Sequence, residues 1–433
     1  STLCSRCVHN HDVFRLCTNK NCAYKIIPDA KYFGNQHLKN KCGLLVGPEL
    51  GIYNGLSADQ MLLLSEQLPP LGDEPNEAQQ PVLFALAKIA RENNLYLVCS
   101  IVERDDAFYN TTTVLDVQGR LVARHRKIHL YLEPGLTPSH EKPVKVQIPG
   151  LGQVELITCF DIFFVEANQD SPSDFAILVS HWFDETPSLT VLSMSRAWSI
   201  CNRTPIIVCN SRFLRQGTLG AGLLFPDGRG QYSMSFSKER EAIHVFDLQM
   251  KPPALIRDPQ DVVTPDSVYQ PILPDLTRYK RIALTHASGA EQIDLPTVSC
   301  QITYELEYQT DNTMYIMLAA DGVRRFGNGD RLYLQEVYAI AVDAKTQKLT
   351  LRSGPRFRSL RISLTIKDDI PSRSVFPTIV GNNLSLVDAT SWQFNRDQTE
   401  LVLEDIDVVC AGMFRRVFSK DIVVTSRQRS QSL

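Results

Sequence analysis

The spacing of apolar residues changes near the middle of the chain and divides it into two halves. Up to about residue 250, short runs of consecutive apolar residues alternate with segments whose apolar residues recur at helical spacing. Runs with little alternation are typical of strands covered on both faces, so the first half predicts a layered α/β domain. The expected strands include residues 95–102, 154–157 and 174–180, and the expected helices are residues 77–93 and 190–202.

The second half has a different pattern, in which apolar and polar residues mostly alternate from residue 298 onward. This period of two indicates strands with one buried and one exposed face, as in an all-β sandwich. A proline-rich stretch between the halves predicts a linker or wrapping segment. The expected organisation is a Cys-rich N-terminal segment (1–41), an α/β domain (42–250), the linker (251–297) and an all-β C-terminal domain (298–433).

The composition is that of a folded protein, with 43% hydrophobic and 21% charged residues among 433 and a net charge of −3. This balance gives no support to nucleic-acid binding, which calls for a basic face. No run of about eighteen apolar residues is present, so no transmembrane segment is predicted. The oligomeric state is not fixed by the sequence.

Cysteines are concentrated at the start of the chain, and their total of 11 is odd. Their clustering predicts disulfides that clamp an irregular segment of a secreted protein, and at least one cysteine is left unpaired. The spacing C-x2-C-x9-C-x4-C leaves zinc binding open as an alternative. A chain that begins without Met fits a signal peptide removed ahead of residue 1. The clustered residues are Cys4, Cys7, Cys17, Cys22 and Cys42.

Three Asn-X-Ser/Thr sequons add the expectation that the protein is glycosylated. They begin at Asn110, Asn202 and Asn383. Asn202 lies in a segment expected to be buried, so it is the least suited of the three to carry sugar.

Three chemically complementary residues follow or end predicted strands: Glu49, Lys127 and Cys159. Strand ends in layered α/β domains converge on one edge of a sheet, where sites are built. A carboxylate can accept the thiol proton, the thiolate can attack a carbonyl, and an ammonium can stabilise the oxyanion. The backbone N–H of Phe160 is a candidate second oxyanion donor. Together they predict a cysteine hydrolase of amides that needs no metal or cofactor.

Each of these residues alone also has an ordinary structural explanation. A strand-end cysteine is most often buried packing, and a Lys–Glu pair is most often a surface ion pair of little energetic weight. The prediction of an active site therefore depends on the three occurring together.

The segments around these residues strengthen the prediction by resemblance. Gly47-Pro-Glu49-Leu-Gly, His125-Arg-Lys127-Ile-His-Leu and Thr158-Cys159-Phe-Asp-Ile-Phe-Phe resemble, in order, the signature segments of the nitrilase (carbon–nitrogen hydrolase) superfamily. Tyr109-Asn-Thr and Ser195-Arg-Ala-Trp198 are similar to its vanin/biotinidase branch.

The resemblance implies a four-layer α-β-β-α nitrilase domain followed by an all-β domain, with Glu49, Lys127 and Cys159 as a catalytic triad. It also implies hydrolysis of pantetheine-like or biotinyl amides in an extracellular setting, with the small-molecule amide as the partner.

The resemblance suggests two supporting residues and shows two departures. Glu133 matches a second active-site glutamate that orients the lysine, and Trp182 matches an aromatic that lines the pocket. Val165 stands where the vanin branch tends to have His, and the strand that normally opens the domain is not visible within residues 1–41. These departures leave open the alternative of a catalytically inactive nitrilase-fold module that binds or supports other molecules.

Overall fold

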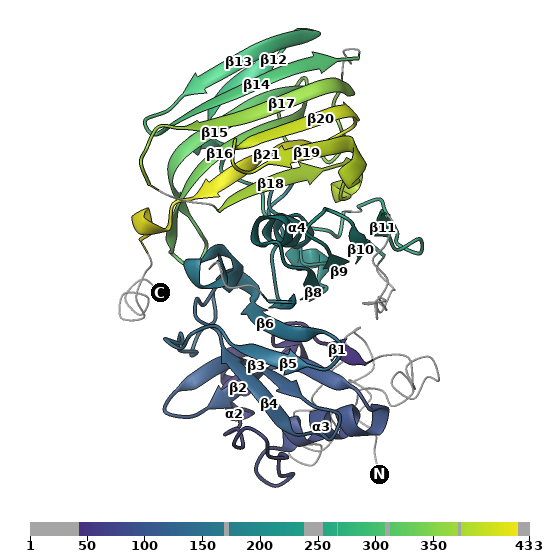
Figure 1. The fold of residues 1–433 in the computed structure, drawn as a ribbon, viewed down its shortest axis with the longest axis vertical. Coiled ribbons are helices and arrows are strands. Elements are labelled where there is room, and N and C mark those ends of the chain that lie inside the picture. Colours follow the sequence, from purple (N-terminus) through teal and green to yellow (C-terminus); the bar gives the residue numbers. More distant parts are fainter. Residues whose placement is uncertain are drawn as a thin grey trace.

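The computed structural model describes residues 43–168, 173–237, 254–265, 267–307, 312–370 and 374–422. The Cys-rich segment 1–41, with its predicted disulfides or zinc site, lies outside these residues. The α/β domain, which contains two sheets, makes up the lower part of the molecule, and two further sheets make up the upper part (Figure 1).

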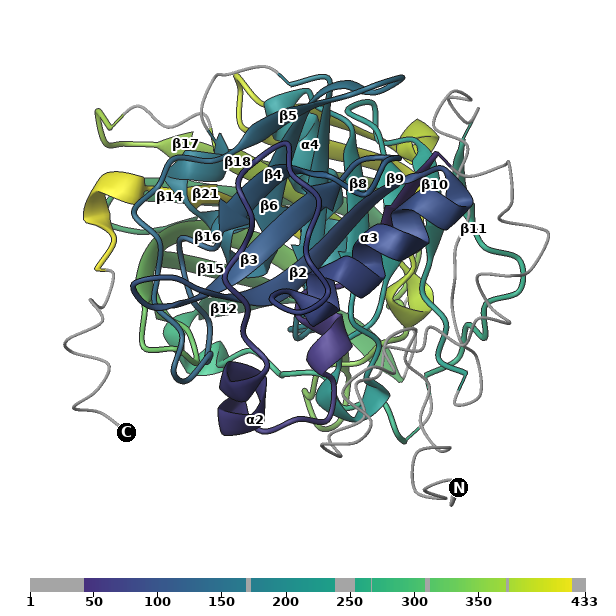
Figure 2. The same cartoon turned by 90° about the horizontal axis from the view of Figure 1, so that it is seen from below.

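The first sheet of the α/β domain has four strands in the order β1-β2-β3-β4. Strand β1 is parallel to β2, and the other neighbours are antiparallel. Helix α3 packs its apolar stripe, with Leu83 and Leu86 fully buried, against this sheet, and Figure 2 shows it lying across the strands. The elements are β1 (Leu44–Val46), β2 (Tyr96–Arg104), β3 (Phe108–Leu115), β4 (Leu121–Arg126), α2 (Ala58–Leu63) and α3 (Pro81–Asn93).

The second sheet has seven strands in the order β11-β10-β9-β8-β7-β6-β5, with β6, β7 and β8 parallel at its centre. Helix α4 contacts β8 and β9. The elements are β5 (Lys145–Ile148), β6 (Gly152–Thr158), β7 (Phe175–Ser180), α4 (Val191–Asn202), β8 (Ile206–Asn210), β9 (Ala221–Leu224), β10 (Gly230–Ser233) and β11 (Leu255–Arg257).

An apolar core joins the two sheets face to face, with Val98 and Val114 of the first against Leu156 and Val179 of the second. The order of layers is therefore helix, sheet, sheet, helix, which confirms the predicted α-β-β-α domain. None of the helices in the described ranges is long and apolar enough to cross a membrane.

The C-terminal part consists of two antiparallel five-stranded sheets that enclose a second core. Strand β14 shows the predicted alternation, because every second residue from Val298 to Leu306 is buried. One sheet has β12 (Lys280–Leu284), β15 (Thr313–Arg325), β16 (Arg331–Asp343), β21 (Cys410–Arg416) and β18 (Val375–Val380); the other has β13 (Ser288–Asp294), β14 (Val298–Leu306), β17 (Phe357–Ile366), β20 (Glu400–Ile406) and β19 (Trp392–Asn395).

The predicted linker or wrapping segment 251–297 contains three strands in its described part. Strand β11 extends the seven-stranded sheet of the α/β domain, whereas β12 and β13 belong to the sandwich, so the sandwich begins before residue 298. Strand β12 lies at a sheet edge and is largely exposed at its start, so it lacks a clear apolar period.

Helix α4 connects the two domains because it packs on β8 and β9 of one and on β18 of the other (Figure 1). Its Arg196 is 2% exposed and donates to the carbonyl oxygens of Ile379 (2.7 Å) and Val387 (2.6 Å). One continuous apolar cluster runs from residues 159–164 through α4 into the sandwich. The interface is thus a shared core rather than a flexible joint.

Candidate active site

The three predicted catalytic residues all lie at or just beyond the C-terminal ends of strands. Glu49 follows β1, Lys127 follows β4, and Cys159 follows β6 and begins a 3₁₀ helix, Cys159–Phe163. Cys159 has a φ of 47°, in the left-handed region that side chains rarely adopt, so the chain turns sharply at the thiol.

Residues next to the two glutamates share this unusual backbone conformation. Leu50, after Glu49, has a φ of 47°, and Leu132, before Glu133, has a φ of 54°. Strained conformations of this kind cluster at functional sites, where the surrounding structure holds them in place.

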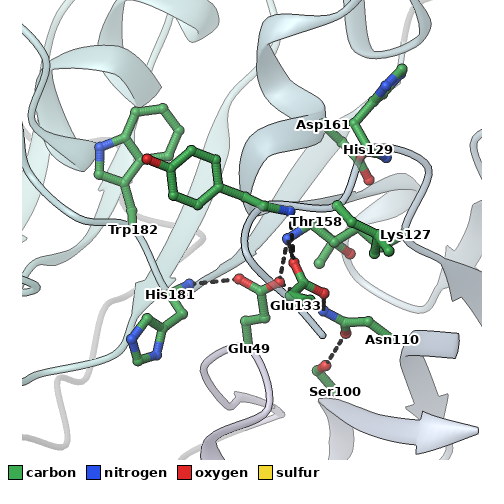
Figure 3. A network of polar contacts seen from close by, with 12 residues as sticks. Glu49, Ser100, Asn110, Lys127, His129, Glu133, Thr158, Asp161, His181 and Trp182 are labelled. Carbon is green, nitrogen blue, oxygen red and sulfur yellow. Dashed lines mark hydrogen bonds and ion pairs between the residues drawn. The ribbon is translucent and has the colours of Figure 1, made fainter. Parts of the chain in front are cut away.

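The ammonium of Lys127 lies between two carboxylates (Figure 3). It donates to Glu49 Oε1 at 2.6 Å and to Glu133 Oε1, and the Lys127 side chain is only 1% exposed. Glu133 also accepts from the backbone N–H of Tyr131 at 3.2 Å. The structure therefore brings Glu133 onto the lysine, at the place expected from the resemblance.

Two residues that sequence reasoning did not single out complete this network. Asn110 Nδ2 donates to Glu49 Oε1 (2.7 Å) and to Glu133 Oε2 (2.9 Å), and Ser100 Oγ donates to Asn110 Oδ1 (2.7 Å). Asn110 is fully buried, so it cannot carry a glycan in this fold. The only signal for it in the sequence was its place in Tyr109-Asn-Thr, one of the segments that carry the resemblance.

Glu49 also ties the two sheets together at the site. Its Oε2 accepts from the backbone N–H of His181 at 2.8 Å, and its own N–H donates to the carbonyl of Ser180 at 3.3 Å. Both oxygens of Glu49 are thus held in fixed directions, one by side chains of the first sheet and one by the backbone after β7 (Figure 3).

Burial and charge set the protonation states of the site. Burial raises the pKa of the Cys159 thiol and Glu49 adds to this, while Lys127, the Ser180 hydroxyl and the His181 N–H pull it down without reversing the shift. Burial also opposes the charge on Lys127, but Glu133 and Glu49 outweigh it, so the pKa of the lysine lies well above its usual value. The resting site therefore holds a neutral thiol, which needs a base to activate it.

Asp161, two residues after the thiol, connects the nucleophile segment (residues 159–164) to the lysine segment (residues 127–129). Its Oδ1 accepts from the N–H of His129 at 2.7 Å and its Oδ2 from the N–H of Ile128 at 3.3 Å, while His125 Nε2 lies 3.5 Å away. Asp161 is 3% exposed. These bonds brace the turn at Cys159 against the residues that follow Lys127.

The sandwich domain reaches the site through the turn between β15 and β16. The ring of Phe326 lies 5.3 Å from that of Phe160, centroid to centroid, and Asn328 Nδ2 donates to the carbonyl of Leu130 at 2.8 Å. The ring of Tyr131 also packs edge-on against Phe160 at 5.1 Å. The segment carrying Glu133 and the residue after the nucleophile therefore both rest on the second domain.

Trp182 lies near the site, with its side chain packed into the core. It is 6% exposed, its indole N–H donates to the carbonyl of Leu189 at 3.2 Å, and its ring stacks on Phe163 at 5.3 Å. Its neighbour His181 is less buried and contacts the rings of Phe183 and Phe213. Contact of Trp182 with a substrate, and oxyanion binding by the Phe160 N–H, stay predictions.

The remaining cysteines of the described residues form no disulfides. Burial raises the pKa of Cys201 and of Cys209 to about 12, as expected for packing residues. Within the described ranges no group of three or more His, Cys, Asp or Glu residues could hold a metal ion.

Comparison with known proteins agrees with this geometry. The profile of the carbon-nitrogen hydrolase family matches residues 25–249, and the profile of the vanin C-terminal domain matches residues 270–421. The first match begins before the expected domain start at residue 42.

Curated relatives match most of the chain at low identity. Human pantetheine hydrolase VNN2 is 23% identical over 79% of this chain and 72% of its own length. Bovine pantetheinase is 21% identical over 88% and 81%, and biotinidase of Takifugu rubripes is 28% identical over 42% of each chain. A solved nitrilase-superfamily amidase from Nesterenkonia has a TM-score of 0.38 at 19% identity, covering 46% of this chain and 76% of that one.

The layered fold and the family match define a carbon–nitrogen hydrolase, and the chain belongs to that family. Its second domain is of the vanin C-terminal type. The protein is accordingly an amide hydrolase that works through a thiol, and the alternative of a catalytically inactive module is not favoured.

Proposed function

We propose that the protein hydrolyses a linear pantetheine-like amide through a thioester on Cys159, with Glu49 as the proton carrier and Lys127 as the oxyanion stabiliser. The observation that carries the proposal is the buried Glu49–Lys127 pair, 2.6 Å apart, whose charges both act on the Cys159 thiol. A neutral thiol beside a carboxylate is the arrangement that general-base activation requires.

The reaction proceeds in two halves that share one proton carrier. Glu49 takes the thiol proton while the sulfur of Cys159 attacks the amide carbonyl, and Lys127 balances the negative charge that develops on the oxygen. Glu49 then gives the proton to the leaving nitrogen, which departs as a free amine and leaves a thioester. A water molecule that Glu49 deprotonates attacks the thioester, the acid leaves, and the proton returns to the sulfur.

The choice of amide rests on the extent of similarity. Relatives named pantetheinase are similar over most of both chains, whereas the named biotinidase is similar over 42% of this chain. Biotinyl amides are therefore the second candidate. Contact of Trp182 with either substrate, and oxyanion binding by the backbone N–H of Phe160, belong to the same proposal.

The test compares Cys159→Ala with Cys209→Ala, which removes a half-buried thiol on β8 that has no part in the proposed chemistry. Release of the amine from pantetheine and from biotinyl-lysine is measured for the wild type and both variants. We expect Cys159→Ala to lose at least about 10³-fold in kcat and Cys209→Ala to stay near wild type. Hydrolysis that persists in pure Cys159→Ala would refute the thioester mechanism, and a preference for biotinyl-lysine would replace the proposed substrate.

We further propose an extracellular location, supported by the five cysteines in the first 42 residues. Intact mass before and after reduction, with alkylation of freed thiols, counts the disulfides. Eleven free thiols in protein purified from culture medium or cells would contradict the proposal.

A further inference from the structure

Asn110 occupies a central place in the buried network although it has no charge and no reactivity of its own. A primary amide has two N–H bonds, and here one points to Glu49 Oε1 (2.7 Å) and the other to Glu133 Oε2 (2.9 Å) (Figure 3). Asn110 lies on β3 and is fully buried. The amide therefore spans the two carboxylates.

Ser100, on the neighbouring strand β2, favours this orientation of the amide. Its hydroxyl donates to Asn110 Oδ1 at 2.7 Å and is itself only 1% exposed. A flipped amide would direct its oxygen at two carboxylates, so the opposite orientation is disfavoured.

The site holds more carboxylates than cations, and the amide compensates with hydrogen bonds rather than with charge. Two carboxylates, Glu49 and Glu133, face one ammonium, that of Lys127. Buried like charges repel strongly unless each has hydrogen-bond donors. Asn110 supplies one donor to each carboxylate and, being neutral, does so at every pH.

We propose that Asn110 is a positioning residue that holds Glu49 and Glu133 at a fixed separation around Lys127, with Ser100 orienting its amide. The inference rests on the proposed function, in which Glu49 moves the proton of the thiol. In this arrangement the direction of the Glu49 carboxylate, and hence its approach to the sulfur, depends on a side chain that takes no part in the chemistry.

The proposal has a consequence for pH dependence. Burial raises the pKa of Glu133, Lys127 opposes the rise, Glu49 adds to it, and the hydrogen bonds of Lys127 and Asn110 lower it. Loss of the Asn110 donor therefore raises the pKa of Glu133 further, and the acid limb of the activity profile moves to higher pH. The charged and titratable groups that face the cluster are Glu49, Lys127, Cys159, Asp161 and His181.

The experiment uses the full-length protein with Asn110→Asp, Ser100→Ala and, as a control, Thr113→Val. Thr113 is also buried on β3, but it faces away from the site and donates to the carbonyl of Cys99 at 3.1 Å. For each variant we measure kcat and KM across pH, the melting temperature, and the rate at which iodoacetamide alkylates Cys159, located by peptide mass spectrometry.

We expect Asn110→Asp to lower kcat about 10²-fold with little change in KM and to move the acid limb up by about one pH unit or more. Alkylation of Cys159 should slow as well, because the Glu49 carboxylate is no longer held in its direction toward the sulfur. Ser100→Ala should show a smaller change of the same kind, about tenfold in kcat. Thr113→Val should lose stability without any shift of the limb.

The proposal would be overturned if Asn110→Asp kept the wild-type acid limb of the activity profile and the wild-type alkylation profile. It would also be overturned if the acid limb of Thr113→Val moved by as much as that of Asn110→Asp. If Asn110→Asp does not fold, Ser100→Ala decides, and a wild-type kcat and limb in that variant would overturn it. Failure of the proposed function is distinguishable, because it shows as persistent activity in Cys159→Ala whatever the Asn110 variants do.

Discussion

Replacing Asp161 with alanine would cut the connection between the nucleophile segment and the lysine segment. The carboxylate accepts from two backbone N–H groups, those of His129 at 2.7 Å and Ile128 at 3.3 Å. Alanine offers no acceptor in place of the carboxylate. Both N–H groups would then be left without a partner at a half-buried position.

The magnitude follows from these contacts. An unpaired buried donor costs about 1–3 kcal/mol, and because Ile128 and His129 are half-buried the lower part of that range applies, giving roughly 2–4 kcal/mol for the pair. For a domain of this size each kcal/mol corresponds to about 2–4 °C, so the melting temperature should fall by on the order of 10 °C. Asp161→Asn keeps one acceptor and should lose about half as much.

The assay combines differential scanning calorimetry with kcat measured well below the new melting temperature. Asp161→Ala should also lose roughly 10–100-fold in kcat, since Lys127 precedes the released segment directly. The decisive comparison is between the two variants, since Asp161→Ala should lose more melting temperature than Asp161→Asn. A melting temperature for Asp161→Ala within about 2 °C of wild type, or a greater loss in Asp161→Asn, would refute the assignment of Asp161 as a brace.

Three further predictions concern the surroundings of the site. Phe326→Ala removes an aromatic contact with Phe160 that is worth about 0.5–1.5 kcal/mol. In initial-rate assays kcat/KM should fall about tenfold. An unchanged kcat/KM would mean that the sandwich domain does not shape the site. Burial raises the pKa of Asp184 to about 8, so the contribution of this group to stability is lost as pH rises from about 4 to 8. The melting temperature of Asp184→Asn relative to wild type should therefore be higher at pH 8 than at pH 5. An equal difference in melting temperature at the two pH values would contradict this. Leu132→Gly removes the backbone strain of a residue that has a left-handed conformation and is 58% exposed. The value of kcat should fall because Glu133 is held less firmly, while the melting temperature stays the same or rises. A clear drop in melting temperature would contradict stored strain at Leu132.

The sequence was informative wherever local pattern and chemistry coincide. Glu49, Lys127 and Cys159 each end or follow a predicted strand, so their convergence at strand ends could be predicted. Asn110 could not be found in this way, because its partners Glu49 and Glu133 lie 61 and 23 residues away and an Asn-X-Thr in a strand carries no sign of them.

Strands β12 and β13 were not predicted, for a different physical reason. Edge strands such as β12 and β13 bury little, so their residues show weak periodicity and were read together with the prolines before them as a linker. The contact of Phe326 with the nucleophile segment was equally invisible, since it depends on how two domains dock. Local patterns therefore locate candidate chemistry well and its supporting contacts poorly.

The dependence of the site on the turn between β15 and β16 has a consequence for how the protein is made. Synthesis proceeds from the N-terminus, and domains generally fold in that order. The α/β domain therefore emerges with its nucleophile turn uncovered, and the support from Phe326 and Asn328 arrives only when the sandwich has been synthesised. We expect a ribosome-bound chain to remain a poor catalyst until that turn has docked, so hydrolytic activity would report docking of the second domain.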